Sequence, residues 1–251
     1  MRKLEGYGVL DVLSPEVFSI LQLCATTEPL FPNIKTLDLQ PAVGSIPFIP
    51  LFLSPRTTTI TIGFPHSSFP AAMVASIITT IPTLCPNLED IHIHSLPRDP
   101  RVTTAASRMV LASNRNALRS FRVEFPLTEE ACGVIYTHPG LRTLSMVIER
   151  DTSSPSVVLP NLTDLMIRYN RNNDWLRVFS GATFGSLEAV TFYSYSEQIG
   201  VFLETFERAA LATSIQHTLW KFYLFTVCSW NPNYSSLHRL TQMTDLIVEF
   251  T

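Results

Sequence analysis

Three residues with the chemistry of metal ligands or of general acids and bases alternate along one short segment. Asp90, His92 and His94 are separated by the single apolar residues Ile91 and Ile93. Alternate residues of a β-strand point to the same face, so this segment would place a carboxylate and two imidazoles on one surface. Such a set could bind zinc, but no neighbouring Cys or His completes a four-ligand site. The pattern therefore favours a polar surface that faces a partner, or incidental exposure, and we expect no bound metal.

A second pattern is formed by arginines. Arg101, Arg108, Arg115 and Arg122 recur every seven residues, a spacing that keeps side chains on one face of a helix. They could bind an acidic partner or RNA, although a solvated outer helix face is the simpler interpretation, and Arg122 falls on an expected strand instead. The formal net charge of the whole chain is −3, whereas contact with phosphates needs a basic surface. We therefore expect no nucleic-acid partner.

The sequence contains no recognisable enzyme motif. It lacks a nucleophile elbow, a Walker loop, a dinucleotide fingerprint and the His-Glu-x-x-His zinc motif. The glycine pair most like a phosphate loop, Gly181 and Gly185, precedes an expected strand rather than following one. We therefore expect a protein that is not an enzyme and has no catalytic residues and no cofactor; an unrecognised hydrolase remains an alternative.

The segments that position these residues form a repeat. One pattern of three apolar residues recurs nine times with a mean spacing of about 26 residues. Two residues separate the first apolar residue from the second, and one residue separates the second from the third. One copy is weaker because it begins with Thr. The second half of each copy alternates apolar and polar residues, which predicts a short strand. The nine triplets are Ile34/Leu37/Leu39, Thr57/Ile60/Ile62, Leu88/Ile91/Ile93, Leu118/Phe121/Val123, Leu141/Leu144/Met146, Leu162/Leu165/Ile167, Leu187/Val190/Phe192, Leu219/Phe222/Leu224 and Met243/Leu246/Val248.

Turn signals and helical windows separate the expected strands. Pro32-Asn33, Pro86-Asn87 and Pro160-Asn161 stand directly before a triplet, where Pro and Asn end the preceding element and turn the chain. Apolar periodicity and N-terminal signals predict helices at residues 15–23, 71–81, 102–113, 128–136, 175–179 and 199–211. The intervals 39–57 and 146–162 are too short for much helix and predict tight loops or 3₁₀ turns.

One strand and one helix every 26 residues fall within the range of leucine-rich repeats. A single unit of this kind cannot bury its own apolar face, whereas stacked units form a continuous core. We predict an α/β fold: a leucine-rich-repeat-like solenoid with a parallel concave sheet and helices or irregular turns on the convex side. Residues 1–30 would form an N-terminal helical cap and residues 31–251 an irregular solenoid of about nine repeats; an ordinary α/β domain is the alternative.

The chain resembles the repeat region of fungal F-box proteins. The segments that carry this resemblance are SPEVFSILQLCATTEPLFPNIKTLDL, TLCPNLEDIHIHSLPRDP, LASNRNALRSFRVEFPLTEEA and VLPNLTDLMIRY. In that family an N-terminal F-box binds the adaptor of a cullin-based ubiquitin ligase, and the repeats hold the substrate. The resemblance thus implies a protein-interaction scaffold, similar to the substrate-recognition arm of such a ligase.

The N-terminal segment departs from the family pattern. Only 33 residues precede Ile34, too few for a full F-box before the first strand, and the apolar residues Val17, Phe18, Ile20 and Leu21 are more simply used to cap the first repeat. We therefore expect binding of the ligase adaptor only if an F-box is encoded upstream. A non-functional or truncated paralogue is the alternative interpretation.

The polar residues between the apolar positions of the triplets would line the concave face and bind a protein substrate or partner. Mixed charge with Tyr and Arg is typical of protein-binding hot spots. The residues expected to make this contact are Asp90, His92, His94, Arg122, Glu124, Asp164, Arg168, Tyr193, Lys221 and Tyr223.

The cellular environment can also be predicted. The chain has four cysteines, far apart and without a Cys-x-x-Cys pair, which favours free thiols in a reducing compartment. The first residues lack the apolar region of a signal peptide, and no uninterrupted apolar stretch is long enough for a transmembrane helix. We expect a cytoplasmic or nuclear protein that does not bind membranes.

Overall fold

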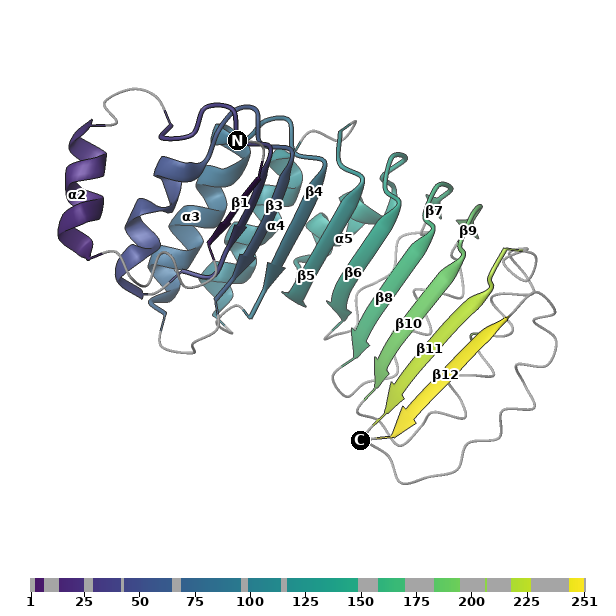
Figure 1. Ribbon diagram of the computed structural model, residues 1–251. Coiled ribbons are helices and arrows are strands. Elements are labelled where there is room, and N and C mark those ends of the chain that lie inside the picture. Colours follow the sequence, from purple (N-terminus) through teal and green to yellow (C-terminus); the bar gives the residue numbers. More distant parts are fainter. Residues whose placement is uncertain are drawn as a thin grey trace. The chain divides into compact units, whose positions relative to one another are not determined.

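The structure is a computed structural model with an α/β fold (Figure 1). It describes residues 3–6, 14–24, 29–41, 43–64, 69–95, 99–113, 117–148, 158–169, 183–194, 206, 218–226 and 244–250. The chain divides into two compact units, unit 1 (Met1–Ala131) and unit 2 (Cys132–Thr251). None of the helices in the described ranges is both long and apolar enough to cross a membrane.

Unit 1 is built from parallel strands that follow one another in sequence order, β1-β2-β3-β4-β5. The strands are β1 (Lys3–Gly6), β2 (Thr36–Leu39), β3 (Thr59–Gly63), β4 (Asp90–His94) and β5 (Ser120–Pro126). The helical elements are α2 (Pro15–Cys24), the 3₁₀ helix η1 (Val43–Phe52), α3 (Ala71–Leu84) and α4 (Pro100–Ala112). Helices α3 and α4 lie together on one side of the strands (Figure 1).

Unit 2 repeats this arrangement with strands in the order β6-β8-β10-β11-β12, again all parallel. The strands are β6 (Thr143–Ile148), β8 (Asp164–Tyr169), β10 (Ala189–Ser194), β11 (Lys221–Thr226) and β12 (Asp245–Phe250). Two further strands, β7 (Val158–Leu159) and β9 (Thr183–Phe184), pair with each other. Helix α5 (Glu129–Tyr136) contains the boundary between the units.

The prediction that the nine apolar triplets form parallel strands is confirmed. Each triplet ends within one of the strands β2, β3, β4, β5, β6, β8, β10, β11 or β12. The middle residues of the triplets pair across neighbouring strands, as Leu37 with Ile60 and Leu165 with Val190, and all four are buried. The triplets whose side chains the structure describes therefore form the core, because the register places equivalent residues side by side.

The helices also agree with the sequence where the structure describes them. The windows at 15–23, 71–81, 102–113 and 128–136 correspond to α2, α3, α4 and α5, and the interval 39–57 contains the expected 3₁₀ helix, η1. The windows at 175–179 and 199–211 lie outside the described residues, apart from the buried Phe206. Strand β1, which pairs with β2, was not predicted, because Lys3–Gly6 carries no triplet.

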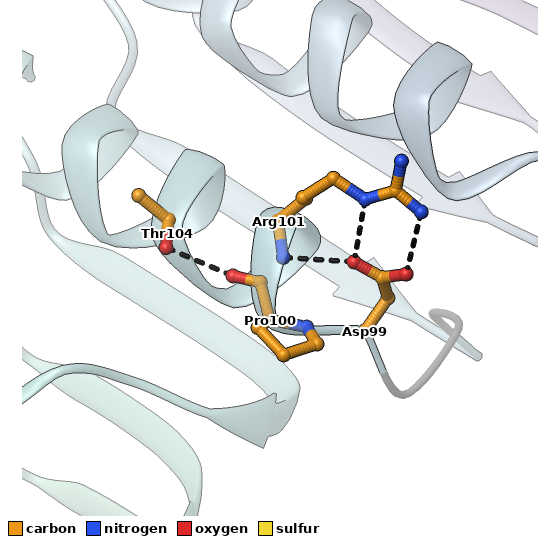
Figure 2. Close-up of polar contacts among 4 residues, drawn as sticks. All are labelled: Asp99, Pro100, Arg101 and Thr104. Carbon is orange, nitrogen blue, oxygen red and sulfur yellow. Dashed lines mark hydrogen bonds and ion pairs between the residues drawn. The ribbon is translucent and has the colours of Figure 1, made fainter.

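Helix α4 begins with a side-chain cap (Figure 2). Asp99 accepts a hydrogen bond from the backbone N–H of Arg101 at 2.8 Å, and its carboxylate also pairs with the Arg101 guanidinium at 2.9–3.0 Å. Pro100 occupies the first turn of α4, where its missing N–H costs nothing. The hydrogen bonds from Arg101 lower the pKa of Asp99 from 3.8 to about 2. The start of α4 is therefore fixed by three consecutive residues.

Within each unit, the backbone connects successive repeats through a recurring pair of hydrogen bonds. Just before a strand, one carbonyl accepts hydrogen bonds from two consecutive N–H groups of the next repeat: Thr58 O, for example, accepts from Glu89 N at 2.8 Å and from Asp90 N at 3.0 Å. The carbonyls that do this in the described residues belong to Lys35, Thr58, Glu89, Arg142, Thr163, Glu188 and Trp220. These residues share one position in the repeat, directly after the first residue of a triplet.

The Pro-Asn dipeptides form a second connection between repeats. Asn87 donates its amide to Pro55 O at 3.1 Å, and Asn161 donates to Pro139 O at 2.8 Å. The backbone of Gly185 comes so close to Pro160 that a Cβ at position 185 would lie 2.5 Å from the Pro160 carbonyl oxygen. The residues that the sequence marks only as turn formers thus also bind the preceding repeat.

Candidate functional site

The strands of each unit have one buried side and one side on which most described residues are partly exposed, which we call the open face; Ser145 on β6 is buried at an open-face position. Along β2 and β3 the exposure alternates, so that Leu37, Leu39, Ile60 and Ile62 are buried and the residues between them are partly exposed. All ten residues predicted to contact a partner lie at open-face positions, because period-2 alternation puts them opposite the buried triplets. Five belong to unit 1 and five to unit 2, and each group is described separately.

In unit 1, the row of Asp90, His92 and His94 lies on the open face of β4 as predicted. The imidazole rings of His92 and His94 are 5.1 Å apart between centroids. The Asp90 carboxylate accepts a hydrogen bond from Thr59 Oγ1 at 3.2 Å. The ring of His94 lies over Gly63, its register partner on β3, where a Cβ would come within 2.2 Å of the ring. The row is therefore held partly by its neighbours on β3.

This row does not form a metal centre in the part of the chain that the structure describes. No group of three or more His, Cys, Asp or Glu side chains there is arranged to hold a metal ion. The remaining two unit 1 residues extend the open face onto β5: Arg122 is the register partner of His92 and is exposed, and Glu124 follows two residues later and is partly exposed. The open face of unit 1 is thus polar, with charges of both signs.

The open face of unit 2 contains a stack of three planar groups on three adjacent strands. Tyr193 on β10 and Phe225 on β11 are register partners, and their rings are stacked with centroids 4.6 Å apart and planes 9° apart. On β8, the register partner of Tyr193 is Arg168. Its guanidinium carbon lies 5.1 Å from the centre of the Tyr193 ring, within the range of a cation–π contact.

The other unit 2 residues surround this stack. Lys221 lies on β11, and its ammonium nitrogen is 4.1 Å from the centre of the Trp220 ring; Trp220 donates from Nε1 to Glu188 Oε2 at 3.3 Å. Tyr223 lies between Lys221 and Phe225 on the open face, and Asp164 begins β8 and is exposed. The structure therefore groups Arg168 and Tyr193 closely, with Lys221, Tyr223 and Asp164 in neighbouring rows.

Two residues of this surface were missed by the sequence reasoning. Phe225 completes the stack, and Met166 lies at an open-face position of β8 beside Thr191. Both are apolar, whereas the predicted contact surface consists of charged residues, His and Tyr. Period-2 alternation continued from Tyr223 would have found Phe225, and alternation from Asp164 would have found Met166.

The prediction that α2 covers the first repeat with its apolar side chains is wrong for two of the four residues named. Val17 is 38% exposed and Ile20 is 59% exposed, and Leu23, one further turn along the helix, is 77% exposed. Leu21 is partly buried, and the side chain of Phe18 lies outside the described residues. Val17, Ile20 and Leu23, which are spaced three residues apart, therefore form an exposed stripe that faces away from the rest of unit 1.

Comparison with known proteins identifies no relative: no protein-family model, no curated protein and no solved structure matches the chain. The function must therefore be argued from the geometry of the two open faces.

Proposed function

We propose that the chain is a leucine-rich-repeat-like solenoid that acts as a protein-interaction scaffold and is not an enzyme. Its open faces would be the concave, partner-binding surface, as in the substrate-recognition arm of an F-box ubiquitin-ligase subunit. Binding of the ligase adaptor would require an F-box outside residues 1–251. We place the protein in the cytoplasm or the nucleus.

The solenoid is supported by the regularity of the connections between repeats. The carbonyl at one repeat position accepts the same pair of N–H groups along each unit, and Asn87 and Asn161 of the Pro-Asn dipeptides donate to the preceding repeat. An ordinary α/β domain requires parallel neighbours but does not require that each unit contact the next through the same atoms. Stacked repeats do, because each repeat contacts only its neighbours.

The observation that carries the scaffold function is the open face of unit 2. Arg168, Tyr193 and Phe225 are only partly buried although they are large and ordered against one another. Tyr and Arg are enriched among the residues that contribute most to protein–protein binding. A surface that exposes such residues on consecutive strands is suited to a protein partner rather than to a small molecule, which needs an enclosed pocket.

The proposal is tested by affinity purification with paired variants. The full chain, the double variant Tyr193→Ala/Phe225→Ala and the variant Arg108→Ala are immobilised, and bound proteins are quantified by mass spectrometry. Arg108 is a matched control because it is exposed on α4, away from the strands.

We expect a small set of proteins that bind the full chain and Arg108→Ala but not the double variant. Circular dichroism and thermal unfolding must show that both variants fold. If the folded double variant and the full chain bind the same proteins to the same extent, the open face of unit 2 is not the binding surface and the proposal fails.

A further inference from the structure

We propose that the partner is held on unit 2 through an extended peptide segment in which two basic residues alternate with an apolar one. The site is the open face of two paired strands, with Tyr223 and Phe225 on β11 and Asp245, Ile247 and Glu249 on β12, which we call the β11–β12 patch. This inference rests on the proposed scaffold function and adds to it the location of the main contact and the chemistry of the partner.

The centre of the β11–β12 patch is apolar. Ile247 is 40% exposed, and its register partner on β11 is Tyr223, which is partly exposed. Phe225 follows Tyr223 by two residues on the same face and is held by its stacking on the ring of Tyr193. A side chain that is already ordered loses less freedom when a partner binds. The patch therefore offers a continuous surface for an apolar side chain of the partner.

The two ends of the patch on β12 are acidic. Asp245 precedes Ile247 by two residues and Glu249 follows it by two, so period-2 alternation assigns all three positions to the open face. Glu249 is also the register partner of Phe225, so the second acidic position lies beside the aromatic stack. An apolar position thus lies between two acidic ones along a single strand.

The base nearest to the patch does not cancel this acidity. Lys221 is the register partner of Asp245, but its ammonium lies over the Trp220 ring at 4.1 Å from the ring centre. On the other side of Trp220, the exposed Glu188 accepts a hydrogen bond from the indole N–H at 3.3 Å. Counted over β10, β11, β12 and the residues directly before them, three carboxylates (Glu188, Asp245 and Glu249) and one ammonium give a formal charge of −2. This charge selects a basic partner.

The spacing along β12 selects an extended segment. A strand rises about 3.3 Å per residue, so Asp245, Ile247 and Glu249 follow one another at intervals of about 6.6 Å. An extended peptide that lies along β12 has the same interval between alternate residues. It can therefore place an apolar residue at Ile247 and a Lys or Arg at each acidic position. The expected pattern in the partner is basic–x–apolar–x–basic, where x is any residue.

Asp164 on β8 provides a matched control for Asp245. Both lie in one row of the open face, because the register pairs Asp164 with Ala189, Ala189 with Lys221 and Lys221 with Asp245. Strand β8 is three strand spacings, or about 14 Å, from β12, which exceeds the screening length of about 8 Å in physiological salt. The other charged open-face residue of β8 is Arg168, so the charges on that strand sum to zero.

The test uses a library of random twelve-residue peptides displayed on phage and selected on the full chain. We expect enriched peptides to carry the basic–x–apolar–x–basic pattern. The best peptide is then synthesised, and its dissociation constant is measured by fluorescence anisotropy against the full chain, Asp245→Lys and Asp164→Lys. We expect Asp245→Lys to weaken binding at least about fivefold, because an attraction becomes a repulsion, and Asp164→Lys to leave it unchanged within about twofold.

A second measurement uses only the unaltered chain and does not depend on the folding of a variant. Replacing both basic residues of the synthetic peptide by Gln should weaken binding at least about tenfold. A peptide of the same composition, in which the two basic residues are adjacent instead of alternating with the apolar one, should bind at least about fivefold more weakly, because only one of them can then reach an acidic position.

Four results would each overturn this inference: enrichment of Asp or Glu in the selected peptides, no enriched peptide at all, equal binding of the three synthetic peptides, or equal effects of Asp245→Lys and Asp164→Lys. None of these results contradicts the scaffold itself, which fails only if the paired variants of the affinity purification bind the same proteins.

Discussion

Replacing Leu165 by Ala tests whether the triplets form the core. Leu165 is the middle residue of its triplet, is 4% exposed, and pairs with Leu144 on β6 and Val190 on β10. All three are buried. The substitution removes three carbon atoms from a site enclosed on both sides by neighbouring strands, so the surroundings can close the cavity only in part.

The expected loss follows from this environment. A buried Leu→Ala change removes the transfer free energy of the lost groups and adds a cavity cost, together about 2–5 kcal/mol. For a chain of this size each kcal/mol lowers the midpoint of thermal unfolding by about 2–4 °C. We therefore expect Leu165→Ala to unfold about 4–20 °C below the unaltered chain.

The neighbouring residue provides the control. Asp164 is adjacent in sequence, but it lies on the open face and is exposed, so Asp164→Ala should change the free energy of unfolding by no more than about 0.5 kcal/mol. Both variants are measured by guanidinium chloride unfolding and by thermal unfolding, each followed by circular dichroism, and the midpoint and slope of the chemical transition are fitted separately. Equal midpoints for Leu165→Ala and the unaltered chain, or a larger loss for Asp164→Ala, would show that the register of β8 is wrong.

Four other predictions concern single groups. Asn161→Ala removes the amide donor that binds the preceding repeat and should lower the free energy of unfolding by about 0.5–1.5 kcal/mol in chemical denaturation; an unchanged midpoint would show that this contact does not connect repeats. Burial raises the pKa of Cys85 to about 11, so its thiol should not react with a disulfide reagent at pH 8 until the chain is unfolded; labelling of the folded chain, detected by peptide mapping, would contradict its buried position. The folded-state pKa of Asp99 is about 2, below its usual 3.8, so its charge stabilises the folded chain above about pH 4 and this contribution is lost as the pH falls toward 2; the stability difference between the unaltered chain and Asp99→Asn should shrink over that range, and a constant difference would refute the pairing. Elemental analysis should find no stoichiometric zinc, whereas one metal per chain that is lost on replacing His92 and His94 by Ala would establish a metal site.

The strands could be predicted because the same apolar pattern recurs in each repeat. A single apolar triplet is ambiguous, but nine copies with the same internal spacing allow each to be checked against the others, and period-2 alternation then fixes which side is buried. The same alternation placed the ten candidate residues on the open face. Strand β1 could not be found in this way, since Lys3–Gly6 has one Leu and its strand conformation depends on pairing with β2.

The contacts between side chains on the open face could not be predicted. The sequence places Arg168, Tyr193 and Phe225 at one position of the repeat, directly after the third residue of a triplet, and the register pairs these positions on neighbouring strands. The repeat does not say which way the side chains turn, so the 5.1 Å approach of Arg168 to the Tyr193 ring does not follow from it. The predicted contact surface also did not include Phe225, although its ring stacks on that of Tyr193. Chemistry that depends on neighbouring strands is visible only after the strands have been aligned.

The exposed stripe of α2 shows a second limit of prediction from sequence. N-terminal helix signals correctly predicted a helix over residues 15–23, and the physical argument that terminal repeats must be covered suggested which way it would turn. Periodicity fixes only which residues share a face and does not say what that face contacts. Val17 and Ile20 are on one face as expected, and the structure turns that face outward. A helix face inferred from sequence therefore says what its residues contact only when the neighbouring element is known. The open-face residues lie on strands whose pairing is known, so they support a stronger functional argument than α2 does.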